Sequence, residues 1–341
     1  MKTTLIIIFN SLILLIMISF LYQKCSDMPG RIKETYSLRP RDKIEVPLLP
    51  GIVEKFLWVP PVDTIISHRK EKDGQIIYDV SYDIDEMRTR KVEAVPEGAR
   101  KFLILTGGSN TFGEGIAQGS ELGSVLQKNY KNVRVMNLAY RGYGPYQALG
   151  QMEAINWNLI PQKEGMVLYH LLDFHFNRLL ITPLYLKWSS GLAPFYHYEN
   201  GSFAYKGPIR EQSQFQWPLF LLKFMPFDVI QHFFPEPKID DYAIEMMTQI
   251  FVQMKKAIRL KNPDASLCVL ISPFYNFSNS DWGLKLIKSL KKNSITVLNV
   301  PEIKYDQEYF FPHDSHLTPK AIARLTPEIV KQLEMIGFSD E

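Results

Sequence analysis

A glycine-rich turn around Ser109 follows an apolar run that is typical of a buried strand, and it reads Gly107-Gly108-Ser109-Asn110-Thr111-Phe112-Gly113-Glu114-Gly115. The turn lacks the Gly-Lys-Ser/Thr ending and the G-x-G-x-x-G spacing of phosphate-binding loops, and it does not fit the G-x-S-x-G elbow. A serine between a strand and a helix can present its hydroxyl and its N–H to one ligand, while the glycines let a substrate approach the backbone. The turn therefore predicts a nucleophilic serine.

A base and an acid lie near the other end of the chain, where Asp314 and His316 precede the last predicted helix. A serine hydroxyl needs a base, and the base needs a carboxylate that fixes its tautomer and stabilises the imidazolium. The alternative is a metal site that draws on the side chains of His313, Asp314, His316, Asp173 and His175. That alternative leaves Ser109 in its glycine setting without a purpose.

Five apolar runs are expected to be buried strands, at 101–106, 133–138, 166–172, 267–272 and 295–300. Helical periodicity fills the segments between them, near 122–126, from Pro145, from Asp241, over 282–292 and from Thr318 to about 336 with a break at Pro327. Strand and helix in alternation predict a parallel α/β sheet covered by helices on both faces. Ligands then belong at the carboxyl ends of the strands.

The first hundred residues differ in character from the α/β part, which we assign to 101–341. The run 5–22 holds 18 residues, with Asn10, Ser11 and Ser19 as its clearly polar members, which is just long enough to cross a bilayer. We therefore expect 1–25 to be an uncleaved signal anchor with the body outside the cytoplasm; a cleaved signal with secretion and lipidation at Cys25 are the alternatives. Residues 26–100 are rich in proline and charge and predict a linker with a small β-rich region.

A stretch dense in aromatic residues, 182–237, interrupts the alternation after the third predicted strand. It is expected to be an insertion, either a helical cap that buries its own aromatic side chains or a lid or membrane-facing surface over the site.

These motifs together resemble those of the SGNH (GDSL-type) hydrolases. The resemblance rests on 101–115, on the block Val135-Met136-Asn137-Leu138-Ala139-Tyr140-Arg141-Gly142-Tyr143-Gly144-Pro145 and on 314–319, and it covers about 100–336. It implies a three-layer αβα, flavodoxin-like sheet of about five strands, Ser109 as nucleophile, His316 as base oriented by Asp314, and an oxyanion hole formed by the N–H groups of Ser109 and Gly142. It also implies ester hydrolysis or acyl transfer through a serine acyl-enzyme, with no cofactor.

Three features depart from the family pattern. Gly108 replaces an aspartate that often precedes the serine, and Asp314 and His316 are two residues apart where many members have three. Leu172 stands where an asparagine that donates to the oxyanion is expected. His175 is our candidate replacement, with Asn177 and Arg178 behind it, and simple packing of His175 in its loop is the alternative.

The sequence thus predicts an extracytoplasmic serine esterase acting on O-acyl groups of a glycan or lipid. An O-acyltransferase of a surface polysaccharide and a non-catalytic binding domain of the same fold remain open as alternatives. Lys plus Arg at 39 against Asp plus Glu at 36 gives a net charge of +3, without a basic stripe, which argues against a nucleic-acid partner.

Overall fold

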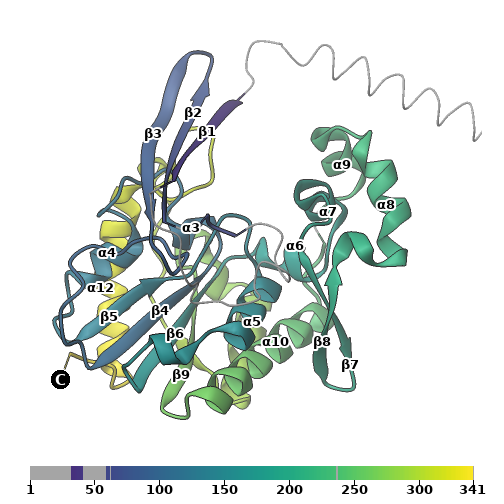
Figure 1. Ribbon diagram of the computed structural model, residues 1–341. Coiled ribbons are helices and arrows are strands. Elements are labelled where there is room, and N and C mark those ends of the chain that lie inside the picture. The colour runs from purple at the N-terminus through teal and green to yellow at the C-terminus, as the bar shows by residue number, and fades with distance from the viewer. Residues whose placement is uncertain (1–31, 41–58, 62, 236, 341) are drawn as a thin grey trace, which may run out of the picture.

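The centre of the molecule is a five-stranded parallel sheet in the order β10-β9-β6-β4-β5. The structure, a computed structural model, describes residues 32–40, 59–61, 63–235 and 237–340 (Figure 1). All five predicted strands are confirmed, as β4 (Lys101–Gly107), β5 (Val133–Asn137), β6 (Glu164–Leu171), β9 (Ala265–Ile271) and β10 (Thr296–Leu298). Counted along this sheet the order is 2-1-3-4-5, the flavodoxin-like arrangement.

Helices cover both faces of the sheet and enclose two hydrophobic cores. One face carries α5 (Pro145–Ala154), α10 (Asp241–Lys261) and α11 (Asp281–Lys292). The other carries α4 (Leu122–Gln127) and α12 (Pro319–Met335). Alternate residues of each strand point to opposite cores, because side chains in a strand alternate between its faces. The result is three layers of helix, sheet and helix.

The predicted break of the last helix at Pro327 is wrong, because α12 runs through that residue to Met335. A proline inside a helix removes one N–H donor, which usually kinks or ends the helix. Here Leu325 and Ile329 on either side are fully buried in the core, so packing holds the helix together. The hydroxyl of Thr326 donates to the carbonyl of Ile322 at 2.8 Å.

An antiparallel sheet of β1 (Ile32–Pro40), β2 (Thr64–Lys72) and β3 (Gln75–Ile84) lies amino-terminal to the α/β part. It packs on the turn after β4 through a small core that includes Ile66, Tyr82 and Phe112. Arg90 fixes this contact, since its buried guanidinium donates to the carbonyls of Phe112, Gly113 and Ile116 at 2.6–2.7 Å. The sheet is therefore joined directly to the turn that contains Ser109.

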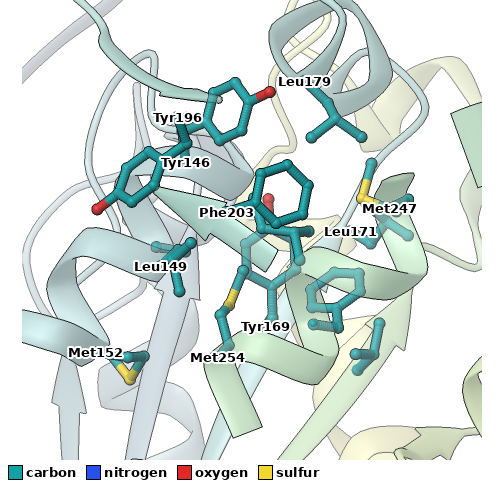
Figure 2. Close-up of a cluster of buried hydrophobic side chains, with 14 of the residues drawn as sticks. Tyr146, Leu149, Met152, Tyr169, Leu171, Leu179, Tyr196, Phe203, Met247 and Met254 are labelled. Carbon is teal, nitrogen blue, oxygen red and sulfur yellow. The ribbon is translucent and has the colours of Figure 1, made fainter. Parts of the chain in front are cut away.

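The aromatic-rich stretch after β6 folds as short helices and a hairpin: α6 (His175–Leu179), α7 (Pro183–Ser189), β7 (Pro194–Glu199), β8 (Ser202–Pro208), η3 (Ile209–Glu211), α8 (Ser213–Lys223) and α9 (Phe227–Phe233). Its hairpin joins the core beneath it. Figure 2 shows Tyr196 and Phe203 from β7 and β8 beside Tyr146 of α5, and the rings of Tyr146 and Tyr196 stack with centroids 5.6 Å apart. Helices α8 and α9 extend away from that core at the upper right of Figure 1.

The predicted membrane segment at 5–22 and Cys25 lie outside the described residues. Within the part of the chain that is described, no helix has both the length and the apolar character needed to cross a bilayer.

Cys268 is buried in β9. Three further 3-10 turns complete the described chain: η2 (Trp157–Leu159), η4 (Phe274–Asn279) and η5 (Gln307–Tyr309).

Candidate active site

Ser109 is the first residue of the four-residue helix α3 (Ser109–Phe112), at the carboxyl end of β4, which lies between β6 and β5 in the sheet. Gly107 and Gly113 bracket this turn with φ values of +145° and +86°, in the region that favours glycine. A side chain would also collide there, because a Cβ on Gly107 lies 2.7 Å from Thr111 Oγ1 and a Cβ on Gly113 lies 2.6 Å from Glu121 Cβ. The glycines therefore allow a turn tight enough to bring the serine to the sheet edge.

The loop that carries Asp314 and His316 lies between η5 and α12 and is held by its own backbone. The N–H of Phe311 donates to the carbonyl of His316, and the N–H of Asp314 donates to the carbonyl of Phe311, each at 3.0 Å. The loop is tied to the serine turn by the N–H of Leu317, which donates to Asn110 Oδ1 at 2.9 Å. Asn110, next to Ser109, thus holds Leu317, next to His316.

Ser109, His316 and Asp314 form one continuous hydrogen-bonded chain. His316 Nε2 lies 2.7 Å from Ser109 Oγ, and His316 Nδ1 lies 2.5 Å from Asp314 Oδ1. Asp314 Oδ1 also accepts the backbone N–H of His316 at 3.0 Å, which fixes the carboxylate against the ring. The three residues that the sequence selected are brought together in the geometry of a catalytic triad.

The electrostatics of this chain favour a basic imidazole beside an ionised aspartate. Burial disfavours the imidazolium, but the Glu114 and Asp314 carboxylates outweigh it and raise the pKa of His316 above its ordinary value. Burial would raise the pKa of Asp314, but its contacts with His316 and Lys70 hold that pKa well below the usual range. Asp314 therefore stays charged at every pH where His316 titrates.

Lys70 of β2 is a residue that the sequence reasoning missed. Its ammonium lies 2.8 Å from Asp314 Oδ2, the oxygen that does not face His316, and 2.7 Å from Glu34 Oε1 on β1. Burial opposes the charge on Lys70, but these two carboxylates prevail and raise its pKa. The amino-terminal sheet thus holds the outer side of the Asp314 carboxylate.

Glu114 is a second carboxylate at the base, and it too was missed. Its Oε2 lies 3.5 Å from His316 Nε2, and its Oε1 lies 3.2 Å from Arg141 Nε and 3.4 Å from the hydroxyl of Tyr36. The guanidinium of Arg141 lies 3.9 Å from the centroid of the Tyr36 ring. Tyr36 in turn stacks on His68, whose pKa burial lowers to about 3, so that His68 is neutral.

A cavity of about 750 Å³ opens beside Ser109 and His316. One part of its lining is polar: Glu34 comes from β1, Lys70 from β2, Arg141 from the turn after β5 and His313 from the loop before α12. Another part is apolar: Leu172, Leu184, Trp188 and Phe227 come from the segment after β6, and Phe277 comes from η4. An ester has both characters, with an apolar acyl chain and a polar alcohol part.

Gly142 lies in a tight turn on the cavity wall. The N–H of Tyr143 donates to the carbonyl of Tyr140 at 3.2 Å, and Gly142 has a φ of +74°, as the third position of a type II turn requires. Trp188 covers this glycine so closely that a Cβ at position 142 would overlap its indole ring, at 1.9 Å from Cη2. Ser109 is at the amino end of α3, where helical N–H groups lack an acceptor within the helix. Gly142 and Ser109 therefore contribute two backbone segments to the lining of the cavity.

His175 is not among the residues that line the cavity, and its Nε2 lies 3.1 Å from the position that a Cβ on Gly108 would take. Its ring is fully buried, and its Nδ1 lies 2.9 Å from the hydroxyl of Tyr169, with burial lowering its pKa well below the ordinary value. Asn177 and Arg178, which the sequence placed behind it, line the cavity together with Leu172. Arg178 also explains Gly108, because a Cβ there would lie 2.8 Å from Arg178 Nη1. The guanidinium occupies the space beside the backbone just before Ser109.

The metal alternative finds no support in the described part of the chain, where no group of three or more His, Cys, Asp and Glu residues is arranged to hold a metal ion. Of its expected members, His316 pairs with Ser109 and Asp314, and the Nδ1 of His175 faces the hydroxyl of Tyr169.

No protein-family model matches the sequence, and no curated protein matches it. The structure is similar to an acetyl xylan esterase from the rumen bacterium Butyrivibrio proteoclasticus, at 13% identity and a TM-score of 0.41, over 72% of this chain and 66% of that one. The chain thus spans just under two thirds of that esterase. It is also similar to a family two carbohydrate esterase from Clostridium thermocellum, solved with cellohexaose, at 10% identity and a TM-score of 0.44 over 80% and 81% of the two chains.

A further similar structure is a member of the lipolytic protein G-D-S-L family from Veillonella parvula, at 11% identity and a TM-score of 0.37, over 68% of this chain and 97% of that one.

Proposed function

We propose that the chain is a serine esterase of SGNH type that cleaves an acyl ester through an acyl-enzyme on Ser109. The observation that carries this proposal is the unbroken contact from Ser109 Oγ through His316 to Asp314, with an open cavity beside the serine. A hydroxyl becomes nucleophilic when a positioned base removes its proton, and a paired carboxylate stabilises the imidazolium that results.

In the first half-reaction Ser109 Oγ attacks the ester carbonyl carbon while its proton passes to His316 Nε2. The developing negative charge on the carbonyl oxygen is met by the N–H groups of Ser109 and Gly142, with the guanidinium of Arg178, which also lines the cavity, as a further donor. The C–O bond to the alcohol then breaks, and the leaving oxygen takes the proton from His316. Ser109 is left acylated and His316 is neutral again.

In the second half-reaction a water molecule replaces the alcohol. Neutral His316 takes a proton from the water as it attacks the acyl carbon, and then returns a proton to Ser109 Oγ as the carboxylic acid leaves. Asp314 remains ionised throughout, because His316 and Lys70 hold its pKa low. Lys70 and Glu34 fix its position and do not enter the proton transfers.

The substrate that fits is an O-acyl group on a glycan or a lipid, with its acyl chain against the apolar wall and its alcohol part against Glu34, Lys70 and Arg141. We also propose that the run 5–22 anchors the protein in a membrane with its body outside the cytoplasm, because that run has the length of a bilayer span.

The test is hydrolysis of a soluble short-chain aryl ester by the full chain in detergent. Ser109→Ala should lower turnover on the order of 10⁴-fold or more, because the nucleophile is lost. Ser315→Ala is the matched control, since Ser315 lines the same cavity and should keep turnover within about threefold. Equal turnover in wild type and Ser109→Ala, or no turnover in wild type, rules the esterase out and leaves a binding domain.

A further inference from the structure

The exposed Trp and Phe side chains of the described chain all lie in one segment, 188–234, which follows β6. They are Trp188, Trp217, Phe220, Phe227, Phe233 and Phe234, each 44–64% exposed. Elsewhere in the described residues, every Trp and Phe whose side chain is described is buried or partly buried. Large aromatic groups are costly to leave in water, so their concentration on one segment marks a contact surface.

Helices α8 and α9 form this surface, which we call the aromatic face and define by Trp217, Phe220, Phe227, Phe233 and Phe234. On α8 only Leu222 is buried, and Trp217 and Phe220 stack on each other with centroids 5.5 Å apart on the outer side. Phe220 also meets Phe224 edge to face at 5.3 Å. The helix therefore turns a continuous stripe of aromatic rings outward.

Cations flank the aromatic face. A groove between α7 and α8 has an apolar floor that includes Leu219, Phe220 and Leu222, and its charged lining residues are Lys187, Arg210 and Lys223. Lys187 Nζ donates to the carbonyl of Lys223 at 3.0 Å and lies 5.8 Å from the centroid of the Phe227 ring. Aromatic side chains bordered by Lys and Arg are the composition of helices that lie in a membrane interface.

The membrane anchor proposed for 5–22 would limit the distance between the bilayer and the start of β1. Residues 23–31 are nine residues between the apolar run 5–22 and the start of β1, and nine extended residues span at most about 30 Å. In Figure 1 the beginning of β1 and helices α8 and α9 all lie toward the upper side of the molecule. A chain anchored through 5–22 therefore brings α8 and α9 toward the same membrane.

We propose that the aromatic face docks on the bilayer surface and that the esterase acts on acyl esters held at that surface, such as acylated lipids or lipid-linked glycans. This inference rests on the proposed function and its membrane anchor. Phe227 belongs both to the aromatic face and to the lining of the cavity, so the docked face would adjoin the proposed active site.

The docking is tested in liposomes with an environment-sensitive fluorophore on the full chain. We would attach the label at Phe233→Cys in a Cys25→Ser background, where the remaining Cys268 is buried. The matched control is Leu260→Cys, an apolar side chain 82% exposed near the end of α10. Lipids that carry a nitroxide quencher should quench the label at 233 and leave the label at 260 bright. Equal quenching at both positions, or quenching at neither, overturns the proposal.

A second copy of the chain is the competing occupant of the aromatic face. Association of two copies predicts that the fluorescence of the label at 233 shifts to the blue as protein concentration rises, and that nitroxide lipids do not quench it. This result would also overturn docking. The quenching experiment reads docking whether or not the protein has esterase activity.

The consequence for substrate is tested with Trp217→Ser, Phe220→Ser and Phe233→Ser combined. The control is the pair Leu260→Ser and Leu284→Ser, which removes exposed apolar side chains outside the aromatic face. Both variants should cleave a soluble aryl ester at the wild-type rate. The triple variant should cleave a long-chain ester in liposomes at least about tenfold more slowly than the control. Equal rates on the liposomal ester would overturn the proposal, whereas loss of the soluble activity in wild type would refute the esterase instead.

Discussion

His316 is placed between two carboxylates, and this distinguishes the site from a simple triad. Asp314 meets Nδ1, and Glu114 Oε2 lies 3.5 Å from Nε2, the nitrogen that takes the serine proton. Arg141 balances part of the Glu114 charge at 3.2 Å. Both carboxylates favour the imidazolium, so the pKa of His316 is raised although the ring is buried.

The first prediction concerns the pH dependence of turnover. His316 must be neutral to accept the proton of Ser109, so activity rises as the pH passes the pKa of His316. Glu114→Gln removes the largest influence that raises this pKa, and the acidic limb of kcat/KM should therefore move to lower pH. The measurement is the pH profile of kcat/KM on a soluble aryl ester.

Glu34→Gln is the control for this profile, because Glu34 lines the same cavity but pairs with Lys70. Its acidic limb should stay near that of wild type. An acidic limb that moves to higher pH in Glu114→Gln, or that moves equally in both variants, would contradict the assigned influence of Glu114.

Trp188 of α7 packs directly against the turn that contains Gly142. The turn needs a positive φ, and the indole ring leaves no space for a side chain at position 142. The insertion therefore helps to position the backbone N–H that we assign to the oxyanion.

The second prediction compares two glycines with nearly equal φ, +74° at Gly142 and +77° at Gly201. Gly142→Ala must displace Trp188 or the turn, and turnover of a soluble ester should fall by about 10²-fold, as expected for one lost oxyanion donor. Gly201→Ala has open space around its Cβ, so it should lower the melting temperature slightly and leave turnover unchanged. Equal turnover in the two variants would show that the Gly142 turn does not serve the oxyanion.

Pro327 shows where a local sequence pattern misleads. It predicted a broken helix, but a core of fully buried residues on either side keeps α12 continuous. The prediction that His175 replaces the missing asparagine stays a prediction. Its ring is buried with Nδ1 toward Tyr169, while its Nε2 lies 3.1 Å from the position that a Cβ on Gly108 would take, next to Ser109.

At the scale of the whole molecule, the parallel sheet and the meeting of Ser109 with His316 could be predicted from the sequence. Apolar runs separated by helical periodicity specify a parallel sheet, and parallel strands end at one edge. Lys70, Glu34 and Arg90 could not be predicted to serve the site, because their partners lie far along the chain. The available signal for Lys70 was its position in β2: it alternates with Ile66 and His68 on the buried face of that strand, where a charged side chain needs a partner.

The amino-terminal sheet and the insertion after β6 both contribute residues to the lining of the cavity. Lys70 steadies the acid on one side, and Trp188 covers the Gly142 turn on the other. Neither segment is part of the five-stranded sheet, yet the proposed chemistry needs both. The fold positions the triad, and these additions shape what it can bind.

Whether Ser109 is a nucleophile activated by His316 can be tested directly with a fluorophosphonate probe. Peptide mass spectrometry identifies the residue of the full chain to which the probe attaches. We expect the probe to modify Ser109 and this modification to be lost in His316→Ala, because the serine needs its base. Modification of a different serine, or equal modification of Ser109 in His316→Ala, would contradict a catalytic serine activated by His316.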